Sequence, residues 1–281
     1  MVQRTVIPRA AVAAALLLAG CATPGPRPDA AAPAGYLSPG DIDRLGRMLA
    51  RAPAAGEAEA EALSLFGAVP PGTDRWWLAT AHAELRPPWA AQHFDCALGT
   101  RLAERPRPAL TRLMARLAAD AAAAARAGGG GDPGPPRPFA RVAGLEPCER
   151  VPAGVRNGPS RPAVGAIVAG AYGELFAALA PDAGAAARRT AREIGWSRAV
   201  CRMNWPADVE DGLAAGAAVY AAAAARPAFT PDLEAARGEL AAARAEGLSS
   251  PACAAERRAL RQWRAPPAPG GQAGRGATSE P

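Results

Sequence analysis

The sequence predicts an all-α fold, a single helical-bundle domain, and three observations favour it. Alanine is the most frequent apolar residue, with runs at 121–125 and 221–225, and it has the highest helix propensity of any residue. Aromatic residues make up only 5% of the chain and β-branched residues are scarce, so a β-sandwich is not expected. A length of 281 residues fits one domain of roughly 200 residues or more, with extensions at its ends.

Helical periodicity of apolar residues begins near Asp41. Pro181 and Pro231 are each followed by an aspartate, which is typical of a helix start. The glycine- and proline-rich segment 128–136 predicts a flexible loop, and irregular chain is expected from there to about residue 162. The helices expected after the first one are 57–66, 73–85, 88–103, 108–127, 163–180, 182–203, 206–225, 231–247 and a short helix at 251–263.

The N-terminus has the pattern of an export signal. Two arginines precede an apolar run that is too short to span a bilayer permanently. The sequence LAGC, ending at Cys21, resembles a bacterial lipobox, in which the cysteine is lipidated and becomes the first residue of the mature protein. An ordinary cleaved signal that ends near a cysteine is the alternative. Because Ala22 is not an aspartate, the resemblance favours the periplasmic face of the outer membrane.

These patterns divide the chain into four parts. Residues 1–20 are the lipoprotein signal peptide, and residues 21–37 hold the lipidated Cys21 and a flexible tether rich in proline, alanine and glycine. The helical domain is expected at 38–264, and a disordered tail at 265–281. The sequence therefore predicts membrane attachment through a lipid, without a second membrane span.

The charge of the chain is modest and scattered. All 32 basic residues are arginine, so no lysine can serve in any site. Removing residues 1–20 takes away two arginines and no acidic residue, which lowers the formal charge from +6 to +4. No basic stripe is interleaved with aromatic residues, and we therefore expect no nucleic-acid partner.

Four cysteines remain after Cys21, and in an oxidising compartment they predict two disulfides. They are Cys96, Cys148, Cys201 and Cys253, and they allow three connectivities. A metal site is not expected, because the chain has no CxxC and its two histidines lie far from most of these cysteines in sequence. We expect no cofactor.

The most informative segment is SRAVCRMNWPADVEDG at 197–212. In it, Ser197 and Arg198 are followed by Asn204 after five residues and by Asp208 after three more. This pattern resembles the third signature of the bacterial class A non-specific acid phosphatases. That family belongs to the superfamily of the type 2 phosphatidic acid phosphatases and the vanadium haloperoxidases. In the signature, a histidine that attacks phosphorus stands at the position of Asn204, and an aspartate that orients it stands at the position of Asp208.

The family's other two signatures are incomplete here. Arg137 and the following Pro-Phe match the end of Lys-x6-Arg-Pro, but Gly130 stands at the lysine position. The signature Pro-Ser-Gly-His falls on 159–162 or on 162–165, the second register being favoured. Its general-acid histidine is thus replaced by Pro162 or Gly165. The resemblance covers roughly residues 70–260.

The resemblance implies the acid phosphatase/haloperoxidase type of helical fold and a phosphate site at Arg137 and Arg198. It also implies lost chemistry, since a carboxamide has no nucleophilic lone pair to attack phosphorus. We expect an envelope lipoprotein that binds phosphate or a phosphoester, or acts as a scaffold, rather than a competent phosphomonoesterase. The resemblance further favours Cys148–Cys201, because both cysteines flank signatures, and then Cys96–Cys253.

Two other functions stay open at this stage. One is an active phosphatase whose catalytic groups have moved, with His82, His93 or a carboxylate doing the work. The other is a helical interaction lipoprotein whose motif is a coincidence, with Arg137 and Arg198 as ordinary arginines that pair with nearby glutamates.

Several single residues have simpler structural interpretations. For His82 and His93 an isolated histidine in the core or on the surface is expected. Arg202 either fills the vacated pocket and pairs with Asp208, or lies on a solvated helix face. Asp208 is expected to cap the helix that starts near residue 206. The three tryptophans Trp76, Trp77 and Trp89 are expected to anchor the core.

Overall fold

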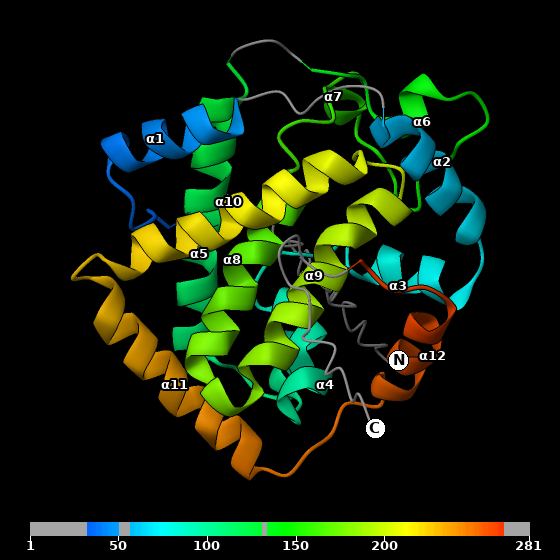
Figure 1. Cartoon of the computed structure of the whole chain (residues 1–281). Helices are drawn as coiled ribbons and strands as arrows, with labels where there is room; N and C mark the ends of the chain where they lie inside the picture. Colours follow the sequence, from blue (N-terminus) through cyan, green and yellow to red (C-terminus); the bar gives the residue numbers. More distant parts are fainter. Residues whose placement is uncertain (1–32, 51–56, 131–133, 267–281) are drawn as a thin grey trace, which may run out of the picture. The chain divides into compact units, whose positions relative to one another are not determined.

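Twelve α-helices and three short 3-10 helices form the secondary structure of the residues that can be described, and this confirms the all-α prediction (Figure 1). The computed structural model describes residues 33–50, 57–130 and 134–266. They fall within one compact unit. The expected signal peptide, the lipidated Cys21, most of the tether and nearly all of the expected tail lie outside the described residues.

Most helices begin and end within a few residues of the bounds expected from the sequence. The α-helices are α1 (Pro39–Leu49), α2 (Glu57–Ala68), α3 (Asp74–Ala81), α4 (Asp95–Leu98), α5 (Pro108–Gly128), α6 (Pro138–Arg141), α7 (Ala153–Arg156), α8 (Val164–Leu179), α9 (Gly184–Val200), α10 (Pro206–Ala224), α11 (Phe229–Ala245) and α12 (Cys253–Gln262). The 3-10 helices are η1 (Trp89–Phe94), η2 (Leu102–Glu104) and η3 (Pro181–Ala183). Two single-turn helices, α6 and α7, lie in the stretch that was expected to be irregular.

The single helix predicted at 88–103 is wrong. The segment forms η1, the single turn α4 and η2 instead. Gly99 ends α4 in a left-handed conformation with φ 65°, which glycine adopts without steric cost. The carboxylate of Asp95 then accepts a hydrogen bond of 2.8 Å from the backbone N–H of Leu102, which holds the chain in a tight turn.

Helix α8 lies at the centre of the fold and packs against α9, α10 and α5 (Figure 1). Its contact with α10 brings the two backbones unusually close together. A Cβ atom at Gly216 would lie 2.1 Å from the carbonyl oxygen of Ile167, and one at Gly170 would lie 2.4 Å from that of Leu213. The small residues that dominate the sequence therefore let these helices approach closely, and they do more than favour helix formation.

The buried apolar residues form two clusters. The larger cluster joins α5, α8 and α11, while the smaller one gathers around the end of α9 and includes Trp76 and Trp205. Trp76 anchors this core as predicted, with 6% of its surface exposed. The same prediction is wrong for Trp77 and Trp89, which are 60% and 55% exposed.

Two disulfides join distant parts of the chain. Cys96–Cys253 links α4 to the start of α12, and Cys148–Cys201 links the loop after α6 to the end of α9. These are the two pairs that the sequence favoured. Over the described ranges, no helix has both the length and the apolar character needed to cross a bilayer.

Candidate functional site

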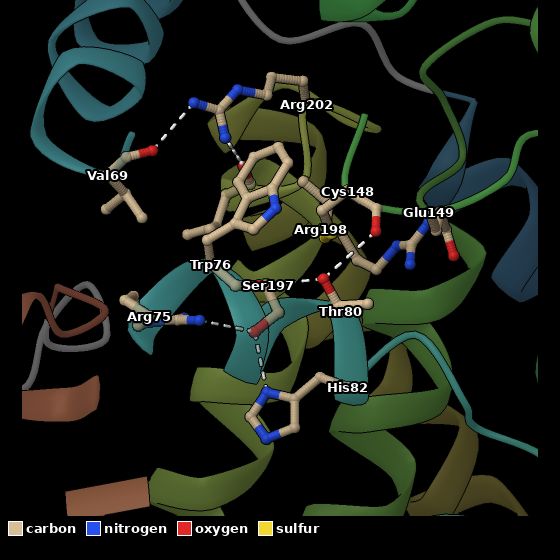
Figure 2. Close-up of a disulfide and its surroundings, with 12 residues drawn as sticks. Val69, Arg75, Trp76, Thr80, His82, Cys148, Glu149, Ser197, Arg198 and Arg202 are labelled. Carbon is tan, nitrogen blue, oxygen red and sulfur yellow. Dashed lines mark hydrogen bonds and ion pairs between the residues drawn. A yellow bond between two sulfur atoms is a disulfide. The ribbon is translucent and has the colours of Figure 1, made fainter. Parts of the chain in front are cut away.

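The two arginines of the expected phosphate site lie close together. Arg198, in the last turn of α9, forms an ion pair with the carboxylate of Glu149, and its side chain is only 11% exposed (Figure 2). Arg137, at the start of α6, donates hydrogen bonds of 2.8 Å and 3.1 Å to the carbonyl oxygens of Met203 and Val155. Burial lowers the pKa of Arg137, and the nearby positive charge of Arg198 lowers it further.

Asn204 lies in the loop between α9 and α10 and is 3% exposed. Its side-chain nitrogen donates a hydrogen bond to the backbone carbonyl of Ser160, which is itself fully buried. Asn204, at the position that the resemblance assigns to the nucleophile, therefore joins two loops through this hydrogen bond. A carboxamide in this arrangement can donate or accept hydrogen bonds, but it has no nucleophilic lone pair.

The carboxylate of Asp208 also contacts other residues of the protein. Its Oδ2 accepts a hydrogen bond of 2.5 Å from the hydroxyl of Ser160, and its Oδ1 lies 4.0 Å from Nε of Arg161. Burial raises the pKa of Asp208, whereas the Ser160 hydrogen bond and the charge of Arg161 act in the opposite direction. The hydroxyl oxygen of Ser160 also accepts the backbone N–H of Trp205 at 3.0 Å. Asp208 lies in the first turn of α10, and a backbone hydrogen bond from the N-cap residue Trp205 also lowers its pKa, so the cap predicted for Asp208 is shared with its contact to Ser160.

Both candidate registers of the second signature lie at this site, and neither supplies a general acid. In one register the signature contains Ser160, which binds Asp208 and Asn204. In the other it ends at Gly165, in the first turn of α8. A Cβ atom at Gly165 would lie 2.9 Å from Cδ of Arg198. A side chain at position 165 would therefore displace the Arg198 side chain.

Both interpretations of Arg202 are wrong. Its backbone has the left-handed φ of 59°, and its side chain turns away from Asp208 into the smaller core cluster. The guanidinium group donates to the carbonyl oxygens of Val200, Phe66 and Val69, at 2.5, 3.2 and 2.9 Å. It also lies 4.2 Å from the ring centre of Trp76 (Figure 2). The end of α2 offers carbonyl acceptors there, and a guanidinium group supplies enough donors to bind several of them.

The two histidines are not isolated, contrary to expectation. His82 follows α3 and His93 lies in η1, and their ring centres are 5.1 Å apart. Nδ1 of His82 lies 2.8 Å from the hydroxyl oxygen of Ser197, which also accepts a hydrogen bond of 3.1 Å from Arg75. Burial lowers the pKa of both histidines, so both are neutral at neutral pH.

The histidines face a different space from the arginines. They line a cavity of about 320 Å³ together with Glu256 and the Cys96 end of a disulfide, and neither Arg137 nor Arg198 lines it. Figure 2 shows how this separation arises, since Ser197 points towards His82 and Arg75 while its neighbour Arg198 points towards Glu149. Within the part of the chain that the structure describes, no cluster of three or more histidine, cysteine or acidic side chains is suited to hold a metal ion.

Sequence reasoning missed three residues of this site. Glu149, Ser160 and Arg161 all contact a residue of the third signature. The position of Glu149 next to Cys148 could have indicated the first of them, because a disulfide to Cys201 places its neighbour close to Arg198. Ser160 carried a weaker signal, as a member of one candidate register.

Comparison with known proteins finds a distant relative. The chain is 29% identical over 173 residues to a protein named acid phosphatase from Zymomonas mobilis subsp. mobilis. In sequence, the chain resembles this acid phosphatase. The match covers 62% of this chain and 65% of the relative, so the chain spans somewhat less than two thirds of the relative's length. No family model matches the chain.

Proposed function

We propose that this chain is an acid phosphatase-like lipoprotein of the bacterial envelope that binds phosphate or a phosphoester and does not hydrolyse phosphate monoesters competently. The observation that carries the proposal is the position of Asn204. Its amide is bound to the carbonyl of Ser160 at the position where the resemblance places a nucleophilic histidine. The likeness in sequence supports the ancestry, and the site chemistry supports the loss of activity.

The expected loss of rate is large because three groups are replaced together. The nucleophile, the general acid and the phosphate-binding lysine correspond to Asn204, Gly165 or Pro162, and Gly130. Each such group contributes about 10² to 10⁴ in rate in enzymes that have it. The sequence contains no lysine, and both of its histidines face the other cavity.

Anion binding rests on Arg137 and Arg198. Their guanidinium groups are partly desolvated, and the positive charge of Arg198 lowers the pKa of Arg137. An oxyanion that contacted both would relieve this repulsion and accept paired hydrogen bonds from planar donors. Inorganic phosphate and the phosphoryl group of an ester both have the required oxygens.

The location at the periplasmic face of the outer membrane rests on the lipobox pattern that ends at Cys21. In this proposal a lipid on Cys21 attaches the chain to the membrane. A Cys21→Ser variant should then leave the membrane fraction of cells that express it. If the variant stays with the membranes in the same amount as the wild type, the lipid-anchor proposal is wrong.

The test of inactivity is hydrolysis of p-nitrophenyl phosphate from acid to neutral pH, with EDTA present and both disulfides formed. We expect no turnover above the uncatalysed rate from folded protein. Asn204→His should stay inactive as well, because the general acid and the lysine are still missing. Saturable hydrolysis by the wild type would overturn the proposal.

The second candidate function is an active phosphatase with relocated catalytic groups. Its support is the pair formed by His82 and His93, which lines a cavity together with Glu256. If hydrolysis is found, the double variant His82→Ala/His93→Ala decides between the sites. Loss of that activity in the folded double variant would support the relocated site, while full retention would exclude a role for both histidines.

A further inference from the structure

We infer that Glu149 is an internal anionic ligand of Arg198, held in place by the Cys148–Cys201 disulfide, and that it determines which anions the site accepts. The inference rests on the proposed function, since it concerns the same arginines. It adds a specificity-determining residue that lies outside the three signatures. External ligands must displace a carboxylate that is already bound.

The disulfide fixes the position of Glu149. Glu149 directly follows Cys148, and Cys201 lies three residues after Arg198 at the end of the same helix. The Cα atoms of the two cysteines are 4.8 Å apart, so the disulfide places the backbone beside Glu149 close to the end of α9. The carbonyl oxygen of Cys148 also accepts a hydrogen bond of 3.2 Å from the hydroxyl of Thr80 (Figure 2). The carboxylate is thus presented to Arg198 by covalent and hydrogen-bonded constraints together.

The contact is strong enough to compete with a ligand because it is partly shielded from water. The side chains of Arg198 and Glu149 are 11% and 23% exposed, and charged hydrogen bonds gain strength as solvent is excluded. Without Glu149, two desolvated guanidinium groups would remain beside each other with less compensating charge. The site would then favour an anion from solution.

This arrangement selects the chemical class of ligand. A small monoanion such as acetate offers one carboxylate, the same group that Glu149 already presents. A dianionic oxyanion such as phosphate carries more charge and more acceptor oxygens, and it can contact Arg137 and Arg198 together. We therefore expect the site to prefer dianionic oxyanions, and to bind them more weakly than two free arginines would.

The experiment is calorimetric titration of folded full-length protein with inorganic phosphate at neutral pH. Glu149→Gln removes the competing charge and keeps both disulfides, and Cys148→Ser/Cys201→Ser releases the loop that carries Glu149. The matched controls are Glu146→Gln, an exposed glutamate in the same loop, and Cys96→Ser/Cys253→Ser, which removes the other disulfide. Circular dichroism shows whether each variant is folded.

We expect Glu149→Gln to bind phosphate about 10-fold to 100-fold more tightly than the wild type. A site that is open in only about 1–10% of molecules loses affinity by that factor. The Cys148→Ser/Cys201→Ser variant should shift in the same direction, and the two controls should bind like the wild type. Acetate should gain affinity in Glu149→Gln as well, because it no longer competes with an equivalent group.

The outcomes separate this inference from the proposed function. If the wild type and Glu149→Gln bind phosphate with the same affinity, the inference is wrong and the proposed anion site stands. If neither binds phosphate at millimolar concentration, both are wrong, because releasing Arg198 produces no anion site. If the Cys148→Ser/Cys201→Ser variant does not fold, the phosphate affinities of Glu149→Gln and Glu146→Gln still test the inference.

Discussion

The hydroxyl group of Ser160 donates a hydrogen bond of 2.5 Å to the carboxylate of Asp208, although the two residues are 48 positions apart in the sequence. In the pattern that the third signature resembles, an aspartate at this position orients a catalytic histidine. Here its partner is a buried serine, whose backbone carbonyl also accepts the amide of Asn204. The positions that the resemblance assigns to catalysis thus form a network that joins the chain before α8 to the start of α10.

Replacing Ser160 by alanine should destabilise the protein by about 1–3 kcal/mol, because it removes a buried hydrogen-bond donor to the carboxylate of Asp208 and a buried acceptor for the N–H of Trp205. The loss should grow as pH rises, since the missing hydrogen bond favours the ionised form of Asp208. Urea unfolding at several pH values measures it, with Ser249→Ala, an exposed serine, as the control. Equal stability of Ser160→Ala and Ser249→Ala would show that the network contributes little.

Arg202 provides an unusual comparison of glycine with alanine. Arg202→Ala should cost about 2–4 kcal/mol, because the carbonyl oxygens of Phe66 and Val69 lose their buried donor. Arg202→Gly should cost about 1 kcal/mol less than Arg202→Ala, since glycine adopts a φ of 59° without the penalty of a Cβ atom. Arg189→Ala, an exposed arginine of α9, is the surface control. A glycine variant that is less stable than the alanine variant would contradict this account of the backbone.

The close contact of α8 with α10 predicts opposite effects of the same substitution in two helices. Gly216→Ala should destabilise the protein by more than about 3 kcal/mol, because the new methyl group would overlap the carbonyl oxygen of Ile167. Gly238→Ala in α11 should stabilise it by about 0.5–1 kcal/mol, since no neighbouring atom lies within 4 Å and alanine is the better helix former. Thermal unfolding of the two variants makes the comparison. Similar shifts in Tm would mean that the two helices can separate at little cost.

Asp95 should make stability depend on pH. Burial raises the pKa of Asp95 to about 6 from the value of 3.8 that it has when exposed. Its folded form therefore binds the proton more tightly than its unfolded form. This contribution to stability is fully present below pH 3.8 and is lost as pH rises through about 6.

The measurement for Asp95 is urea unfolding between pH 4 and 7 of the wild type, of Asp95→Asn and of the exposed control Asp43→Asn. The stability of Asp95→Asn relative to the wild type should increase across this range, by about 1.4 kcal/mol for each unit of pKa difference. Asp43→Asn should follow the wild type. A constant difference between Asp95→Asn and the wild type would exclude this role for Asp95.

The sequence by itself determined the helical class, most helix bounds and the two disulfide pairs that were favoured. These follow from local signals, such as alanine-rich periodicity and prolines at helix starts, or from cysteines that flank recognisable motifs. The prediction of one helix at 88–103 was wrong for a local reason as well. A pattern of apolar residues does not reveal the left-handed turn at Gly99. The resemblance to the family's signatures also grouped Arg137, Arg198, Asn204 and Asp208, because their order and spacing match those signatures.

Only the tertiary structure decided what these residues contact. The partners of Arg198, Asp208 and Asn204 are Glu149 and Ser160, which are 44 to 49 residues away in the chain. Glu149 lies outside all three signatures, and Ser160 lies in only one candidate register of the second. The direction of Arg202 depended on one left-handed backbone angle and on the carbonyl groups at the end of α2. The pairing of His82 with His93 depended on how α3 and η1 both pack against α9. Such contacts arise between surfaces that meet only after the helices pack, so no local pattern in the sequence encodes them.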